Sequence, residues 1–267
     1  MRRNGVSDVL GAILAATRKI VETRKVACPI DRLAAAARER SPNGRLMVER
    51  LARPDSLNVI AECKRRSPSR GVLRADYDAA AVAERYEANG AAAISVLTEP
   101  TFFDGSLDDL AAVRARVTLS VLRKDFIIDE YQLVEARAAG ADAVLLIVAA
   151  LDARRLRALY DGASALGLAA LVEAHSRAEL DRALALAPQM VGVNCRDLRT
   201  LQVDLAVSLD LVDAIPDDVV AVAESGLGSH DDLCRLRDRG YDGFLVGERL
   251  VTSPDPGLAL CELLRCS

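Results

Sequence analysis

Charged and amide side chains stand at the C-terminal ends of five short apolar runs of this sequence. The runs end at Glu62-Cys63-Lys64, Arg123-Lys124-Asp125, Glu173, Asn194-Cys195-Arg196 and Glu224. Burying such groups together is costly unless they pair, and crowding shifts the pKa values of lysine and glutamate towards those that proton transfer needs at neutral pH. We therefore expect a site that moves protons. The alternative is a structural ring of ion pairs.

Two glycine-containing segments follow the last two of the apolar runs. They are Ser225-Gly226-Leu227-Gly228 and Val246-Gly247-Glu248. Glycine lets an anion approach the backbone closely, and backbone N–H groups at such positions often hold phosphate in α/β barrels. Each glycine alone is more typical of a simple turn, but the pair predicts a phosphate-bearing substrate.

A basic, turn-rich segment follows the first apolar run. It continues from Arg65 and Arg66 through residues 67–71, which include Pro68 and Arg70. We interpret it as a mobile basic lid that could bind a carboxylate or a phosphate, and a solvated charge run is the alternative. Phe102 and Phe103 could wall a pocket for an aromatic ring or only cover the rim of the site.

Eight short apolar runs recur along the 267 residues and predict the elements that position these groups. They occupy residues 58–63, 92–97, 117–122, 143–148, 168–173, 190–194, 219–224 and 243–247. Amphipathic, helix-like stretches lie between most of them, such as 79–88, 131–138 and 153–165. Alternating strands and helices predict a parallel sheet, and eight units without a GxGxxG motif favour a closed (β/α)₈ TIM barrel. The polar strand ends would then meet at the C-terminal mouth of the barrel.

A weak internal repeat supports the alternation of helices and strands. The pattern Gly-x-x-x-apolar begins at Gly90, Gly140 and Gly240. Each glycine is expected to end a helix by adopting a positive φ, after which the next apolar run re-enters the sheet.

Residues 1–57 precede the first predicted strand. They are expected to form an amphipathic helix followed by polar, proline-containing segments, packed as an extension on the barrel of residues 58–267. The start Met1-Arg2-Arg3 and the apolar run after it resemble a short signal peptide, but Asp8 interrupts that run and helical spacing continues past any cleavage point. We expect no signal peptide and no membrane-spanning segment.

Composition excludes several classes of partner and site. The formal net charge is -4, with 35 basic and 39 acidic residues, which leaves no surplus cation for binding nucleic acid. The six cysteines show no CxxC spacing and there are only two histidines, so we expect neither a metal site nor a catalytic triad. The cysteines are also too sparse for a secreted disulfide scaffold, which favours a reducing cytoplasm.

Taken in order, the motifs at these strand ends resemble the indole-3-glycerol-phosphate synthase family of tryptophan biosynthesis, over most of the chain. The residues that carry the resemblance are IAECKRRSPSRG (60–71), SVLTE (95–99), VLRKDF (121–126), LVE (171–173), NCRDL (194–198) and AESG (223–226). The resemblance implies a TIM-barrel carboxy-lyase without a cofactor. It would convert 1-(2-carboxyphenylamino)-1-deoxyribulose 5-phosphate to indole-3-glycerol phosphate, with loss of carbon dioxide and water.

The resemblance also implies roles for individual residues. Lys124 would be the general acid at the substrate carbonyl, and Glu173 would handle protons during dehydration. How Lys64 and Lys124 share the proton donations stays open. Glu62 and Asn194 would orient Lys124 and the substrate hydroxyls, with Glu224 beside the reacting centre.

The same resemblance implies how the substrate would be held. Lys64 and Ser67 would bind its anionic ends, and Arg196 its carboxylate. The phosphate would rest on backbone N–H groups of Ser225, Gly226, Gly247 and Glu248, with help from Lys64.

Three positions depart from the pattern of the family. They are Cys195 in place of Asn or Ser, Ser120 in place of a frequent Pro, and Glu248 where Ser is also common. Cys195 would alter hydrogen bonding beside Asn194. The carboxylate of Glu248 would have to turn away from a phosphate.

Two other functions compete with the lyase. One is another phosphosugar barrel enzyme, such as an isomerase or an aldolase that uses Lys64 or Lys124 as a Schiff base. The other is a silent barrel that only binds a phosphometabolite or a partner. The paired acids and bases argue against mere binding. A monomer is compatible with the sequence, and association with other enzymes of the tryptophan pathway is left open.

Overall fold

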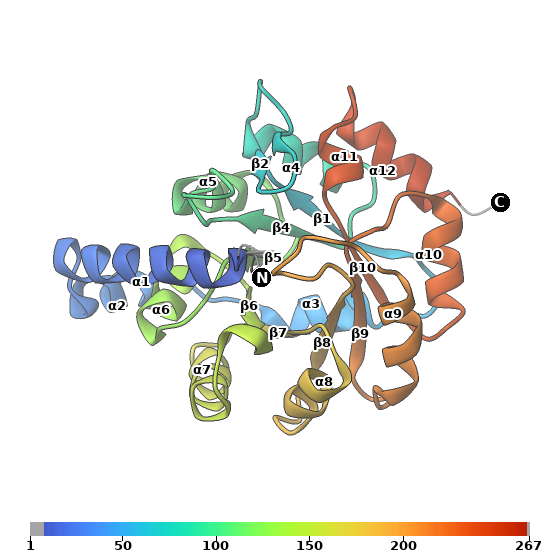
Figure 1. The fold of residues 1–267 in the computed structure, drawn as a ribbon. Helices are drawn as coiled ribbons and strands as arrows, with labels where there is room; N and C mark the ends of the chain where they lie inside the picture. The colour runs from blue at the N-terminus through green and yellow to red at the C-terminus, as the bar shows by residue number, and fades with distance from the viewer. Residues whose placement is uncertain (1–7, 266–267) are drawn as a thin grey trace, which may run out of the picture.

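The computed structural model describes residues 8–265, and these form a closed barrel of eight parallel strands surrounded by helices (Figure 1). The barrel order is β1-β10-β9-β8-β7-β6-β5-β4. Its strands are β1 (Asn58–Cys63), β4 (Ala93–Leu97), β5 (Val121–Lys124), β6 (Ala143–Ile147), β7 (Ala169–Ala174), β8 (Met190–Asn194), β9 (Val220–Glu224) and β10 (Gly243–Val246). The predicted TIM barrel with a helical N-terminal extension is confirmed. Met1-Arg2-Arg3 lies outside the described residues.

The prediction of the third strand was wrong in its bounds. We expected residues 117–122, whereas β5 begins at Val121. The backbone N–H of Val117 caps the preceding helix, and the N–H groups of Thr118 and Leu119 donate to the carboxylate of Glu87. These residues therefore form the loop that enters the strand, although their β-branched and apolar side chains resemble a strand in sequence.

Helices follow the strands on the outside of the barrel, and the last two come after β10. They are α4 (Ala79–Ala88), α5 (Leu107–Arg116), α6 (Glu130–Ala139), α7 (Ala153–Ala165), α8 (Arg177–Leu184), α9 (Ala206–Leu211), α10 (His230–Arg237), α11 (Glu248–Val251) and α12 (Pro256–Leu264). The predicted helices 79–88 and 153–165 are confirmed in full, and 131–138 lies within α6. The three glycines of the internal repeat have φ values of 94°, 95° and 110°, as expected of residues that end helices.

The internal repeat also places an aspartate between helix and strand. Asp142 follows Gly140 by two residues, and its carboxylate accepts hydrogen bonds from the backbone N–H groups of Val121 (3.0 Å) and Asn43 (2.8 Å) and from Arg114 (2.9 Å). Asp242 follows Gly240 in the same way and accepts from the N–H of Ala221 at 2.8 Å. Each aspartate thus binds the start of the neighbouring strand.

Three helices precede β1, where the sequence indicated one amphipathic helix followed by polar, proline-containing segments. They are α1 (Val9–Ala27), α2 (Ile30–Arg38) and α3 (Gly44–Leu51). Both α1 and α2 pack against α6, and α3 packs against β7 and β1. Met47 and Leu51 of α3 are fully buried in the apolar cluster inside the barrel. The sequence analysis did not predict α2 and α3, because short helices are stabilised mainly by packing and leave a weak periodic pattern in the sequence.

The two ends of this interior cluster are covered by different parts of the extension. Leu10 and Ile13, near the start of α1, lie close to Phe126 at the mouth of the barrel. Figure 1 shows this end of α1 reaching over the barrel, while α3 lies on its other side. The segment after β1 is a small antiparallel hairpin of β2 (Arg66–Ser67) and β3 (Gly71–Val72), not an irregular loop. No helix among the described residues is long and apolar enough to cross a membrane.

The two aspartates of the repeat give a matched test of this packing. Asp142→Ala removes three hydrogen bonds at a buried carboxylate and is expected to lower the free energy of unfolding by about 3 kcal/mol or more. Asp242→Ala removes one and should cost about 1 kcal/mol. Urea denaturation followed by circular dichroism measures both, and equal losses would contradict the assignment.

Candidate active site

Four charged side chains form the uppermost layer of the barrel interior, which we call the charged layer. They come from β1, β5, β7 and β9, which are alternate strands of the barrel: Glu62, Lys124, Glu173 and Glu224. Two residues earlier on the same strands lie buried apolar residues of the interior cluster: Ile60, Leu122, Leu171 and Val222. Since every second residue of a strand points to the same side, the charged layer stacks on an apolar one.

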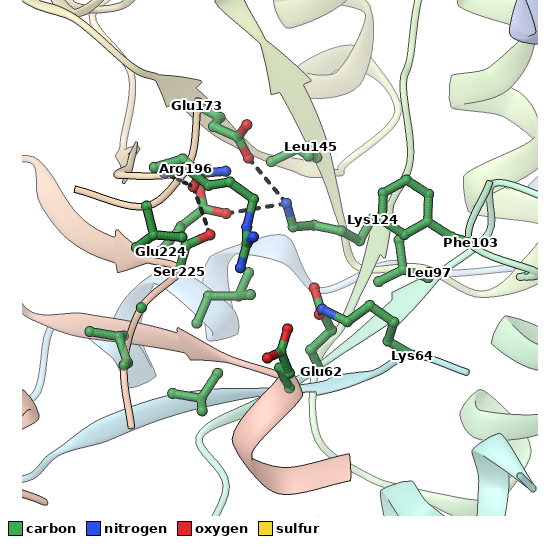
Figure 2. A pocket seen from close by; sticks show the side chains of 18 of the residues that line it. Glu62, Lys64, Leu97, Phe103, Lys124, Leu145, Glu173, Arg196, Glu224 and Ser225 are labelled. Atoms are coloured by element: carbon green, nitrogen blue, oxygen red, sulfur yellow. Dashed lines mark hydrogen bonds and ion pairs between the residues drawn. The ribbon is translucent and has the colours of Figure 1, made fainter. Parts of the chain in front are cut away.

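Lys124 reaches between two of these carboxylates (Figure 2). Its Nζ atom lies 3.1 Å from Glu173 Oε2 and 3.2 Å from Glu224 Oε2. Both glutamate side chains are 1% exposed, and that of Lys124 is 14% exposed. One ammonium group is therefore shared by two carboxyl groups that water barely reaches.

Burial and mutual charge give these three groups different pKa values. Burial lowers the pKa of Lys124, but the charges of Glu173 and Glu224 raise it by more, so the ammonium form persists. Burial raises the pKa of Glu173, yet Lys124 and His175 bring it well below its usual range. Burial and the charge of Glu173 raise the pKa of Glu224 to about 8. At neutral pH the cluster thus holds one ammonium, one carboxylate and one carboxylic acid.

A second lysine lies across the cavity from Lys124. The Nζ atom of Lys64 forms an ion pair with Glu62 Oε1, and Figure 2 shows the two side chains together on the opposite wall. Glu62 makes no ion pair with Lys124 among the described residues, but its charge contributes to the raised pKa of Lys124. Glu62 is also packed against Gly247, where an added Cβ would collide with its carboxylate.

Asn194 connects the ends of β8 and β9. Its Oδ1 atom accepts hydrogen bonds from Ser225 Oγ (2.8 Å) and from the backbone N–H of Arg196 (3.0 Å). The Sγ atom of Cys195 donates to the carbonyl of Ser225 at 3.3 Å, so the cysteine joins the same two loops. Asn194 makes no hydrogen bond to Lys124 among the described residues.

These side chains line one cavity of about 500 Å³ at the C-terminal mouth. Of the residues to which the sequence assigned a catalytic or substrate-binding role, all but Ser67 are in its lining: Glu62, Lys64, Lys124, Glu173, Asn194, Arg196, Glu224, Ser225, Gly226, Gly247 and Glu248. Phe103, Leu145 and Leu245 supply an apolar wall. The cavity therefore has room for an aromatic ring beside charged groups.

Ser67 is the predicted site residue that does not line the main cavity. It lines a smaller neighbouring cavity of about 70 Å³, together with Leu10 and Ile13 of α1. Lys64, Phe103 and Arg196 line both cavities, so the smaller one continues the main site under the N-terminal helix.

The two glycine segments lie side by side in the wall of the main cavity. Ser225 and Gly226 have positive φ values of 68° and 72°, which turn the chain sharply after β9. Gly247 precedes α11, whose first residue is Glu248. The carboxylate of Glu248 forms an ion pair with Arg70 of the basic hairpin at 2.5 Å.

Arg123, which precedes Lys124 in the sequence, points away from the mouth. Its side chain is fully buried on the outer side of β5, where it pairs with Asp125 (2.9 Å) and Glu135 of α6 (3.2 Å). It also donates to the carbonyl of Gln132. Lys124 and Arg123 are adjacent on one strand, so they must point in opposite directions, and only Lys124 faces the interior.

His175 is a residue near the site that sequence reasoning missed. Its Nε2 atom lies 3.2 Å from Glu173 Oε1. The sequence could have indicated this contact, because His175 follows Glu173 by two residues and both side chains therefore lie on the same face of the strand end. Among the described residues there is no group of three or more His, Cys, Asp and Glu side chains that could hold a metal ion.

Comparisons of sequence agree on one family. A family model described as indole-3-glycerol phosphate synthase matches residues 10–263. An indole-3-glycerol phosphate synthase of Kineococcus radiotolerans is 48% identical over 260 residues, which is 96% of this chain and 94% of that protein. One of Laribacter hongkongensis is 47% identical over 262 residues, covering 97% and 99%.

Solved structures similar to this chain share its fold at low sequence identity. A thiamine phosphate pyrophosphorylase from Pyrococcus furiosus has a TM-score of 0.59 and 18% identity, covering 79% of this chain and 95% of its own. KGPDC from Streptococcus mutans has a TM-score of 0.60 and 13% identity, covering 78% and 96%. At these low identities the similarities support only the assignment of the barrel fold.

Gly192 gives a test of how Glu224 is placed. An added Cβ there would collide with Glu224 Oε1, so Gly192→Ala should displace that carboxyl group from Lys124 and lower kcat by roughly tenfold or more, with the fold retained. Gly243→Ala is the matched control, since its Cβ would approach nothing closer than side-chain atoms of Leu51 and Val222, at 3.3 and 3.4 Å. Steady-state kinetics measures both. Equal kcat values in the two variants would contradict the prediction.

Proposed function

Because the chain belongs to the indole-3-glycerol phosphate synthase family, we propose that its charged layer carries out the reaction of that family. The enzyme is a carbon–carbon lyase. It closes the indole ring of indole-3-glycerol phosphate from 1-(2-carboxyphenylamino)-1-deoxyribulose 5-phosphate, with loss of carbon dioxide and water. The observation that carries the assignment of residues is the contact of Lys124 with two buried carboxyl groups.

Lys124 acts as the general acid of ring closure. As the aromatic carbon attacks the substrate carbonyl, charge develops on the carbonyl oxygen, and a positioned ammonium group stabilises and protonates it. The carboxyl groups of Glu173 and Glu224 keep Lys124 in the ammonium form. The same contacts argue against Schiff-base chemistry, because a nucleophilic lysine needs a lowered pKa.

Glu173 and Glu224 divide the remaining proton transfers. Glu173 is ionised and can accept a proton from the ring-closed intermediate during dehydration. Glu224 is protonated at neutral pH and sits beside the reacting centre as a hydrogen-bond donor. Proton transfers of this kind need no cofactor and no metal ion, so we assign none.

The opposite wall holds the anionic ends of the substrate. Lys64, oriented by Glu62, reaches the cavity from β1, and Arg196 contacts the carboxylate that is lost as carbon dioxide. Asn194 fixes the loops that carry Arg196 and Ser225 and faces the substrate hydroxyls. Ser67 closes the site from the smaller cavity, between the hairpin and α1.

The phosphate rests on backbone N–H groups of the two glycine segments. Ser225 and Gly226 supply them from one side, and Gly247 and Glu248 from the other. The ion pair with Arg70 holds the Glu248 carboxylate, which agrees with a contact through its backbone alone. Lys64 adds a positive charge to the same anion.

The cysteines bear on the compartment in which the enzyme works. The described cysteines 28, 63, 195, 234 and 261 are free thiols, which suits a reducing cytoplasm. We propose that the enzyme acts on a phosphorylated small molecule, and its sequence is compatible with a monomer.

A direct assay tests the proposed function. The protein is incubated with 1-(2-carboxyphenylamino)-1-deoxyribulose 5-phosphate, and indole fluorescence and carbon dioxide are followed together. Both should rise in equal amounts, and borohydride added during turnover should trap no adduct on Lys64 or Lys124. Absence of product at every pH would contradict the proposed function. A reduced lysine adduct would favour a Schiff-base enzyme.

The two lysines should differ in their kinetic effects. Lys124→Ala is expected to lower kcat by about 10² to 10⁴ with a small change in KM, because its interaction strengthens in the transition state. Lys64→Ala should instead raise KM by about tenfold, since it binds the ground-state anion as well. An unchanged kcat for Lys124→Ala would refute its role.

Because Glu224 acts in its protonated form, we predict that kcat falls on the basic side, or basic limb, of its pH profile. Its raised pKa means that the active, protonated form is present below about pH 8 and is lost as the pH rises through that value. The kcat of the wild type should therefore decline above about pH 8. Glu224→Gln keeps a neutral donor at every pH, so this limb should move to higher pH in the variant. A limb that stays in place would contradict the assignment.

A further inference from the structure

Lys124 alone does not decide which of its two carboxyl partners is ionised. Its Nζ atom is almost equally distant from Glu173 and Glu224, at 3.1 and 3.2 Å, and both side chains are 1% exposed. Two buried carboxyl groups that share one cation would have similar pKa values, so neither would be favoured as the site of a single proton. A group other than Lys124, Glu173 and Glu224 must therefore make the pKa values of the two carboxyl groups differ.

The two carboxyl groups differ in their other neighbours. Glu173 Oε1 faces His175 Nε2 at 3.2 Å, while its Oε2 faces Lys124. Neither oxygen of Glu224 has an aligned hydrogen bond among the described residues, and the contact of His175 Nε2 with Glu173 is likewise a charge contact and not an aligned hydrogen bond. Glu173 thus lies between two nitrogen groups, and Glu224 lies beside one.

The imidazole of His175 is itself held from the other side. Its Nδ1 atom lies 3.2 Å from Glu179 Oε2, and its backbone N–H donates to the same oxygen at 2.8 Å. Glu179 stands in the first turn of α8, where its backbone N–H donates to Ser176 Oγ at the helix start. The ring is therefore fixed in place by a carboxylate at the edge of the barrel.

A carboxylate oxygen lies 3.2 Å from each ring nitrogen, although only Nδ1 has an aligned hydrogen bond, and two negative charges this close favour the imidazolium form. Burial lowers the pKa of His175, but its contacts with Glu173 and Glu179 raise it to about 10. The other charged groups nearby are Asp197, in the loop after β8, and Lys124, beyond Glu173. Asp197 adds to the negative charge around the ring.

We infer that His175 is a positioning residue for the reaction. Its charged ring, anchored on Glu179, makes Glu173 the ionised partner of Lys124 and leaves the proton on Glu224. This inference rests on the proposed function, in which Glu173 accepts protons and Glu224 donates a hydrogen bond. His175 does not line the main cavity, so it acts on the substrate only through Glu173.

The charge on His175 can be measured without catalysis. The chain has only two histidines, so His230→Gln assigns the ring resonances of His175 in carbon-13-labelled protein by NMR. We expect the His175 signals to stay at the imidazolium position from about pH 6 to about pH 8. Glu173→Gln and Glu179→Gln should each lower the titration midpoint. A wild-type midpoint near the free-imidazole value of about 6.5 would overturn the inference.

The effect on Glu173 is read from the pH profile of kcat. His175→Gln keeps an amide donor but removes the charge, so the acidic limb should move to higher pH by roughly one unit or more, with KM nearly unchanged. A merely structural role would lower kcat equally at every pH, and that result would overturn the inference. If His175→Gln does not fold, Glu179→Gln should move the limb in the same direction by less.

Two controls separate this inference from the proposed function. His230→Gln alters the other histidine, whose ring contacts the carbonyl of Leu263 far from the charged layer, and it should leave the profile in place. Full activity of Glu173→Gln would refute the proton-transfer role of Glu173 itself. The NMR titration would still decide whether His175 is charged beside Glu173.

Discussion

The sharing of one lysine by two buried carboxyl groups is the interaction on which the rest of the site depends. Three ionisable groups at nearly full burial would destabilise the barrel if each carried its charge alone. Lys124 compensates for Glu173, and the proton on Glu224 removes the excess negative charge. The same charge balance leaves a base, Glu173, and a hydrogen-bond donor, Glu224, each within 3.2 Å of the acid Lys124.

The barrel supplies this arrangement through its layers. Alternate strands deliver their inward residues at one height, so an apolar layer lies directly beneath the charged one. Small residues then make space for the large polar ones: Gly192 leaves room for Glu224, and Gly247 leaves room for Glu62. On the outer side of β5, the buried Arg123 ties the strand of Lys124 to α6, and Glu135 of α6 also pairs with Arg24 of α1.

Sequence reasoning predicted the barrel and most of the cavity lining because both depend on periodicity. Polar residues that end apolar runs on parallel strands must meet at one mouth, and this placed Lys124, Glu173 and Glu224 together. The direction of Arg123 could also have been read from strand alternation. Other features needed three-dimensional contacts. His175 gains its importance from Glu179 across a turn, and Ser67 reaches a cavity that exists only because α1 covers the mouth.

The account's central claim is that, at neutral pH, the two carboxyl partners of Lys124 hold one proton between them and that it resides on Glu224. Infrared difference spectroscopy between the wild type and Glu224→Gln at pH 7 tests this most directly, because a buried carboxylic acid has a carbonyl stretch that a carboxylate lacks. The account predicts one such band in the wild type, absent from the variant and lost from the wild type above about pH 8. A wild-type spectrum without that band would contradict it.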